Sequence, residues 1–217
     1  MQPTSLDHVA LWVDDRDSIA DFAVAHLGMH VIERTEKFTL VGSDARRGKL
    51  TLFAAEGPRE QGALARVGLR VSDLEAARAA LPDGLPDVFE IAEGLRVTLV
   101  EAETDTEYDL DHVALFSAGP DAAAQEWLRY GFVPTDDPRR VEVGGAFLEL
   151  VPGSPGEPGR PLLNHLGVLV EAAAPAQRLG VEVADVVDAP NTFAVFVWGP
   201  DRVKLEYVEH KASFSLR

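Results

Sequence analysis

Two histidines and two glutamates in the second half of the chain stand where they could bind a metal ion. His112 and His165 each lie in an apolar run typical of a β-strand, and Glu149 and Glu206 each lie in a later run of the same kind. A carboxylate beside residues such as Phe147 is costly unless a cation or a strong donor compensates it. Imidazoles and carboxylates suit Fe(II), Mn(II), Zn(II) or Ni(II), and two histidines with one carboxylate leave positions open for substrate or O₂.

The first half of the chain does not repeat this set. When the repeated units are aligned, it has other residue types at three of the four positions: Phe53 against Glu149, Arg66 against His165, and Val100 against Glu206. Only His8, opposite His112, is retained. One imidazole without a carboxylate holds a metal poorly, so we predict a structural role for His8 and a site confined to the second half. The chain has no cysteine, which excludes thiolate ligands.

A repeated phrase, Leu-Asp-His-Val-Ala-Leu, shows how these residues are positioned. It occupies residues 6–11 and 110–115, and each copy precedes a helical stretch, a glycine and further strands. Trimmed versions of the same order begin at residues 64 and 163, so we predict four similar units. The acidic segment 101–108 separates the halves, which gives expected domains 1–105, without a metal site, and 106–217, with it.

Charge and composition limit the classes of partner that the protein could bind. A formal net charge of −16 argues against nucleic acid and against an anionic membrane, because both require a basic face. The chain has no basic residue before an apolar run at its start and no run of about 18 apolar residues. We therefore expect a cytoplasmic protein whose partner is a small-molecule substrate, and a homodimer is compatible with the sequence.

These units resemble the βαβββ modules of the vicinal oxygen chelate superfamily, which includes glyoxalase I, bleomycin resistance proteins and type I extradiol dioxygenases. The resemblance covers residues 5–209 and includes the run from Asn191 through Trp198 to Glu206. It implies an α+β fold of two domains, each of two modules forming an open, barrel-like mixed sheet with helices outside. The dioxygenase pattern further implies that His112, His165 and Glu206 bind Fe(II) or Mn(II), which we favour over Zn(II) or Ni(II).

The resemblance leaves three functions open. The first is a metal-dependent enzyme, dioxygenase-like in architecture, acting on a small oxygen-rich substrate that the aromatic residues allow to be aromatic. The second is a glyoxalase-type lyase or isomerase, in which Glu149 is both a fourth ligand and the base. The third is a bleomycin-resistance-type protein that binds a ligand without catalysis. Five residues are candidates for lining the substrate pocket: Phe147, Asn191, Phe193, Phe196 and Trp198.

Overall fold

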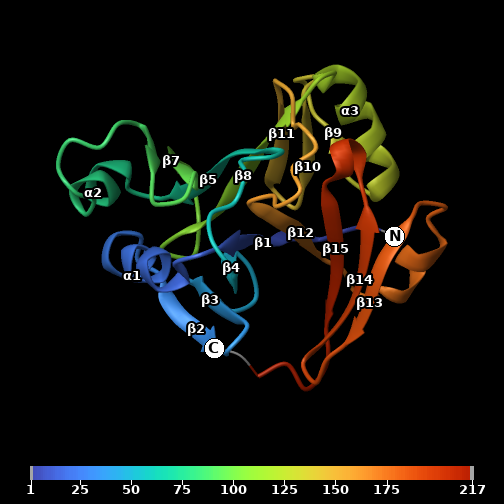
Figure 1. Cartoon of the computed structure of the whole chain (residues 1–217), viewed down its shortest axis with the longest axis horizontal. Coiled ribbons are helices and arrows are strands. Elements are labelled where there is room, and N and C mark those ends of the chain that lie inside the picture. The colour runs from blue at the N-terminus through green and yellow to red at the C-terminus, as the bar shows by residue number, and fades with distance from the viewer. Residues whose placement is uncertain (1, 216–217) are drawn as a thin grey trace.

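The computed structural model describes residues 2–215 and confirms four modules of strand, helix and further strands (Figure 1). Module 1 contains β1 (Ser5–Val13), α1 (Arg16–His26), β2 (His30–Arg34), β3 (Phe38–Gly42) and β4 (Lys49–Ala54). Module 2 contains β5 (Leu64–Val71), α2 (Leu74–Ala79), β6 (Val88–Glu90) and β7 (Arg96–Glu101).

The second half follows the same order. Module 3 contains β8 (Asp109–Ser117), α3 (Pro120–Trp127), a 3₁₀ turn (Leu128–Tyr130), β9 (Val133–Pro134), β10 (Arg140–Val143) and β11 (Ala146–Pro152). Module 4 contains β12 (Leu163–Leu169), a 3₁₀ helix (Ala174–Arg178), β13 (Val183–Asp188), β14 (Thr192–Trp198), a 3₁₀ turn (Pro200–Arg202) and β15 (Lys204–His210).

The modules pair in an order that the sequence analysis did not anticipate. The first sheet runs β13-β14-β15-β12-β1-β4-β3-β2 and joins modules 1 and 4, whereas the second runs β6-β7-β5-β8-β11-β10-β9 and joins modules 2 and 3. Both sheets are mixed, because the antiparallel pairs β1/β12 and β5/β8 sit between parallel neighbours. A boundary near residue 105 therefore does not separate the two sheets, since each takes strands from both halves of the chain.

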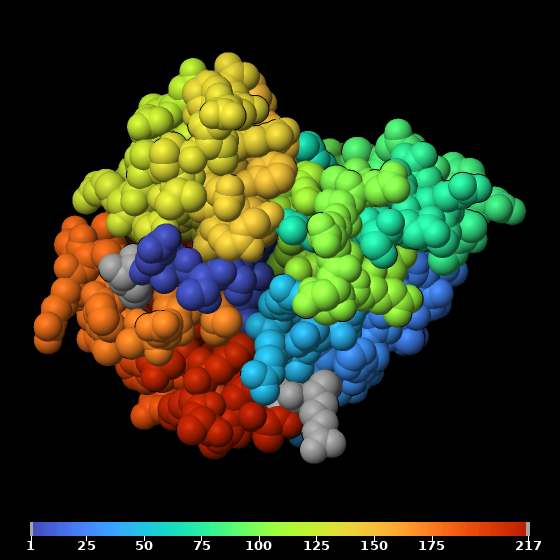
Figure 2. Space-filling view, turned by 180° about the vertical axis from the view of Figure 1, so that it is seen from behind, coloured from blue at the N-terminus to red at the C-terminus, as the bar shows by residue number. Residues whose placement is uncertain are grey.

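Pairing of distant segments is visible on the molecular surface. Figure 2 shows the dark blue N-terminal segment between the yellow third module and the orange fourth module. Thr4 donates its backbone amide to Leu169 of β12 at 2.8 Å, which continues the β1/β12 pairing to the start of the described chain. The end of the first strand of module 4 is thus held against the beginning of module 1.

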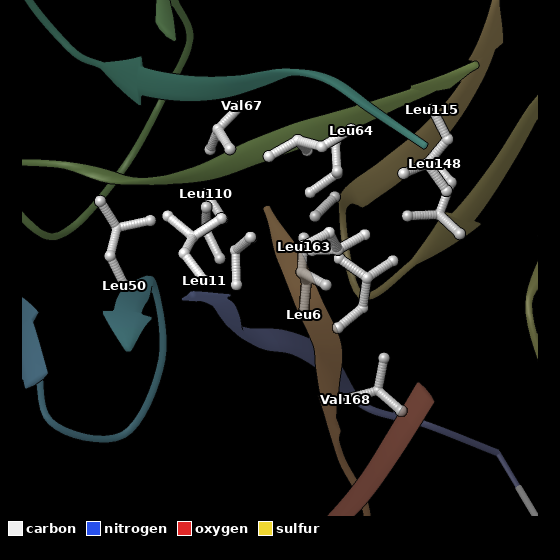
Figure 3. Close-up of a cluster of buried hydrophobic side chains, with 14 of the residues drawn as sticks. Leu6, Leu11, Leu50, Leu64, Val67, Leu110, Leu115, Leu148, Leu163 and Val168 are labelled. Atoms are coloured by element: carbon white, nitrogen blue, oxygen red, sulfur yellow. The ribbon is translucent and has the colours of Figure 1, made fainter. Parts of the chain in front are cut away.

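One apolar core lies where the two sheets meet. Leu6 and Leu11 of β1 extend toward Leu64 of β5 and Leu110 of β8, and all four are buried (Figure 3). From Val9 onward the core takes alternate residues of β1 (Val9, Leu11 and Val13), so the residues next to them face the opposite, concave side of the first sheet. That side carries His8.

Candidate metal centre

Three donor atoms from three strands of the first sheet converge at one point. The Nε2 atoms of His8 (β1) and His165 (β12) lie 3.0 Å apart, and the Oε2 atom of Glu206 (β15) lies 3.0 Å from the first and 2.8 Å from the second. All three side chains are buried, and they form the one cluster with metal-ligand character among the described residues. The sheet order β15-β12-β1 makes these strands immediate neighbours.

The backbone beside each histidine carries a β-bulge. The register of β1 against β12 shifts at Asp7 and again at Asn164, so each of these side chains reaches the imidazole of the next residue. The Nδ1 atom of His8 lies 2.6 Å from Asp7 Oδ1, and that of His165 lies 3.1 Å from Asn164 Oδ1. Each Nδ1 is therefore placed to donate outward, which directs both Nε2 atoms at Glu206.

The His8 ring also needs space on the neighbouring strand. His8 lies opposite Gly167 of β12, and a Cβ at that position would overlap the imidazole. A glycine is thus required here for close packing rather than for its backbone conformation.

Two imidazole lone pairs and a carboxylate at these distances repel one another unless a cation is shared among them. Ligands at adjacent coordination positions of an ion with bonds near 2.1 Å are separated by about 3 Å, which matches the observed 2.8–3.0 Å. The donor set therefore fits a divalent metal ion without rearrangement. In the metal-free protein a proton takes the role of the cation.

The pKa shifts follow from this arrangement. Burial disfavours charged His8, but the neighbouring carboxylates of Glu206 and Asp7 outweigh burial and raise its pKa to about 9. Burial likewise opposes ionisation of Glu206, yet the charge on His8 lowers its pKa to about 2. The pKa of His165 is lowered, first by burial and further by the charges of His8 and Lys204. His8 is therefore the imidazole that carries the proton.

A second network supports His8 from behind. Asp7 accepts from Lys49 Nζ at 2.9 Å, and His210 Nε2 lies 3.4 Å from the same carboxylate. Burial opposes the charge of Asp7, but the charge of Lys49 and the hydrogen bonds to His210 and His8 hold its pKa far below the usual range. Asp7 is consequently a permanent carboxylate behind the His8 imidazole.

The donor atoms face a cleft of about 430 Å³ on the concave side of the first sheet. Phe53, Phe196 and Thr51 line the cleft beside the three donors. Thr51 of β4 pairs with Ala10, two residues after His8, just as Glu206 pairs with Gly167, two residues after His165. A hydroxyl therefore takes the fourth position that a second carboxylate would have occupied.

Two of the four expected ligands lie elsewhere. His112 and Glu149 belong to the second sheet, because module 3 pairs with module 2 and not with module 4. Glu149 forms an ion pair with Arg66 and a second one with Arg140 at 3.0 Å. The structure thus replaces His112 by His8 in the cluster and assigns Glu149 to an internal ion pair.

The second sheet nevertheless repeats the geometry of the first. His112 follows a bulge at Asp111, bonds to that residue through Nδ1 at 2.7 Å, and lies over Gly68 as His8 lies over Gly167. The positions matching His165, Glu206 and Thr51 in strand register are held by other residues: Arg66, Thr98 and Glu149. The buried Nε2 atom of His112 has no hydrogen-bond partner. A guanidinium thus lies where the first sheet has its second imidazole.

The expected pocket residues are divided among several places. Phe196 and Asn191 line the cleft, and the Phe196 ring lies 5.1 Å from that of His165. Trp198 lines a neighbouring cavity, Phe193 packs against the core, and Phe147 stacks on His112 at 4.9 Å.

The sequence analysis also misplaced the counterparts of the glutamates. Strand register puts Thr51, not Phe53, at the position of Glu149, and Thr98, not Val100, at the position of Glu206. The sequence did contain a signal for His8. Like His112, it directly follows an aspartate, and Gly167, its pairing partner on β12, leaves room for its ring.

Comparisons with known proteins agree with this architecture. None of the curated proteins matches the sequence. A putative dioxygenase from Bacillus subtilis subsp. subtilis str. 168 is 15% identical with a TM-score of 0.79, covering 98% of this chain and 87% of its own. Glyoxalase I from Zea mays is 14% identical with a TM-score of 0.71, covering 94% and 92%. The cppA protein from Streptococcus pneumoniae TIGR4 is 18% identical with a TM-score of 0.64, covering 96% and 100%.

The likeness to these structures concerns the fold. Within residues 2–215 no helix is long and apolar enough to cross a membrane. A family model for the Glyoxalase/Bleomycin resistance protein/Dioxygenase superfamily matches residues 5–174, which is most of the sequence. The chain belongs to the glyoxalase, bleomycin resistance protein and dioxygenase superfamily.

Proposed function

We propose that this protein is a divalent-metal-dependent dioxygenase that acts on a small, oxygen-rich aromatic substrate in the cleft of the first sheet. The observation that carries the proposal is the convergence of two histidines and one glutamate at the floor of that cleft. Two histidines and one carboxylate on one side of an ion are typical of sites that bind substrate and O₂ at the remaining positions. Fe(II) or Mn(II) suits this reaction.

His8, His165 and Glu206 would hold the metal, which would polarise the substrate oxygens and supply the redox chemistry. Asp7 and Asn164 fix the imidazole rings so that both Nε2 atoms point the same way. Phe53 and Phe196 flank His165 with ring centroids at 6.2 and 5.1 Å. These rings exclude water and offer faces on which an aromatic substrate can stack.

Proton-transfer chemistry of the glyoxalase type is less well supported. The expected ligand set for that chemistry has a second glutamate besides Glu206, and Glu149 was expected to be this ligand and the base. Arg66 and Arg140 bind Glu149 in the second sheet, and Thr51 takes the corresponding position in the first. A threonine hydroxyl is too weak a base for that role.

The test is reconstitution of metal-free protein with Fe(II), Mn(II), Zn(II) or Ni(II), followed by measurement of O₂ uptake with a panel of catechols. Uptake is expected with Fe(II) or Mn(II), lost in His8→Ala and retained in the matched control His112→Ala. If no reconstituted form takes up O₂ when a catechol is added, the result would contradict the proposal. Conversion of a hemithioacetal with Zn(II) or Ni(II), without O₂ uptake, would favour the lyase.

A further inference from the structure

A second cavity of about 550 Å³ lies on the concave side of the first sheet, beside the metal centre. We call it the indole chamber and define it by Trp12 of β1, Asn164 of β12, Trp198 of β14 and Lys204 of β15. The proline-rich linker of residues 155–161 lies over it. Four neighbouring strands thus each contribute a side chain to its floor.

The chamber is one step along the strands from the metal centre. Lys204 precedes Glu206 by two residues, which is about 7 Å along a strand and on the same face. Asn164 both lines the chamber and bonds to His165. The ring of Trp12 lies 5.3 Å from that of Phe53, which lines the cleft. A ligand in the chamber would therefore lie next to the ligands of the metal.

The charge of Lys204 indicates what the chamber would bind. Lys204 is half-buried, and among the described ion pairs it has no carboxylate partner, although acidic residues far outnumber basic ones in the chain. Its Nζ atom lies 5.2 Å from the centroid of the Trp198 ring. The two carboxylates of the lining, Glu157 and Asp201, are on exposed residues. A half-buried, unpaired cation beside two indoles favours an anion attached to a flat ring.

We propose that the indole chamber binds a planar aromatic carboxylate, with Lys204 holding the carboxylate and Trp12 and Trp198 contacting the ring. The identification of this ligand with the substrate rests on the proposed function. If that function is right, the substrate itself carries the carboxylate. Its oxygen pair would then lie toward Glu206, two residues along β15 from Lys204. The exposed Arg202, which stacks over Trp198 at 4.2 Å, closes the rim.

Binding to metal-free protein tests the chamber independently of the metal chemistry. The probes are 4-methylbenzoate, its neutral alcohol 4-methylbenzyl alcohol, and the cation benzyltrimethylammonium, each followed by tryptophan fluorescence and calorimetry. We expect the carboxylate to bind at least tenfold more tightly than either analogue. Lys204→Met should weaken carboxylate binding about tenfold or more, the usual worth of one charge-assisted hydrogen bond.

Two variants serve as controls. Lys37→Met removes an exposed lysine outside the chamber and should leave binding unchanged. Trp198→Phe should reduce the fluorescence response, because Trp198 lines the chamber and the one indole outside it, Trp127, is buried in the core. Equal binding of the three probes, no binding of the carboxylate at 10 mM (on the order of the weakest specific contacts), or unchanged affinity in Lys204→Met would overturn the proposal. Loss of O₂ uptake with intact carboxylate binding would refute only the dioxygenase.

Discussion

The two sheets are built on one plan, yet they place different charges at its centre. The first sheet has two imidazoles, a carboxylate and a hydroxyl at four corresponding positions: His8, His165, Glu206 and Thr51. The second sheet has one imidazole, a guanidinium, a hydroxyl and a carboxylate: His112, Arg66, Thr98 and Glu149. Only the exchange of an imidazole for a guanidinium changes the set of donors.

This difference shows that the framework requires a cation but not a metal. In the second sheet the cation is part of the protein, because the Arg66 guanidinium neutralises Glu149. In the first sheet no Lys or Arg side chain within ion-pair distance neutralises Glu206 among the described residues, so a proton or a metal ion must do so. A site that needs an external cation can bind one, whereas a site that contains its own cation cannot.

Removal of a ligand gives the largest expected effect. His8→Ala or Glu206→Ala should weaken metal binding by more than the roughly 10–100-fold that loss of a supporting partner costs. His112→Ala, in the second sheet, should leave both affinity and stoichiometry unchanged. Competition with a chromophoric chelator measures all three. Equal losses in His8→Ala and His112→Ala would remove the distinction between the sheets.

The pH dependence of metal binding is the next largest effect. The pKa of His8 is raised to about 9, so at pH 7 the metal must displace a proton, whereas Glu206, with a pKa of about 2, is already ionised. Affinity should rise about tenfold per pH unit toward pH 9 and level off above it. Calorimetry in buffers of different ionisation enthalpy should detect release of one proton, and release of none would contradict this protonation state.

The same pKa affects the stability of the metal-free protein. Because the folded pKa lies above the ordinary value of 6.5, stabilisation by charged His8 is complete below pH 6.5 and is lost as pH rises through 9. The loss is at most about 3 kcal/mol. Thermal unfolding from pH 6 to 9.5 should show it in the parent protein and not in His8→Ala. A parallel decline in both proteins would assign it to other groups.

The second sheet can be used to test the comparison in the opposite direction. Arg66→His would remove the internal cation and supply the missing imidazole beside His112 and Glu149. Metal analysis should then give up to two ions per chain instead of one. Arg140→His, which leaves Arg66 in place, is the matched control and should stay at one. A single ion in Arg66→His would show that the second sheet lacks more than a ligand.

The smallest effect concerns the partners behind the imidazoles. Asp7→Asn removes the charge that supports His8 and should weaken metal binding about 10–100-fold. Asp111→Asn makes the same change beside His112 and should have no effect on metal binding. An effect of similar size in both variants would indicate a general change in stability, which unfolding measurements would reveal.

Much of the fold was predictable because it is encoded locally. The repeated phrase at residues 6–11 and 110–115 and the alternation of later strands predict the modules and their element order, and the structure confirms them. His165 and Glu206 could be recognised for the same reason, since polar groups in apolar strands are costly. The bulges at Asp7 and Asn164 could not, because a register shift depends on the partner strand.

Pairing between modules was not predictable in this way. β1 and β8 carry the same six residues, so nothing local decides which of them lies beside β12. The choice depends on long-range packing of the whole chain around a single core. The sequence analysis assumed that consecutive modules pair. It therefore expected His112 in the site instead of His8, and it gave Glu149 a ligand role for the same reason.

The location of the metal tests the central claim most directly. Crystals grown with Mn(II) and measured at a wavelength where manganese scatters anomalously should show one peak, bonded to His8, His165 and Glu206 at about 2.0–2.2 Å. The second sheet should show none, with Arg66 still paired to Glu149. A peak bonded to His112 and Glu149, or no peak at His8 under saturating Mn(II), would contradict the account.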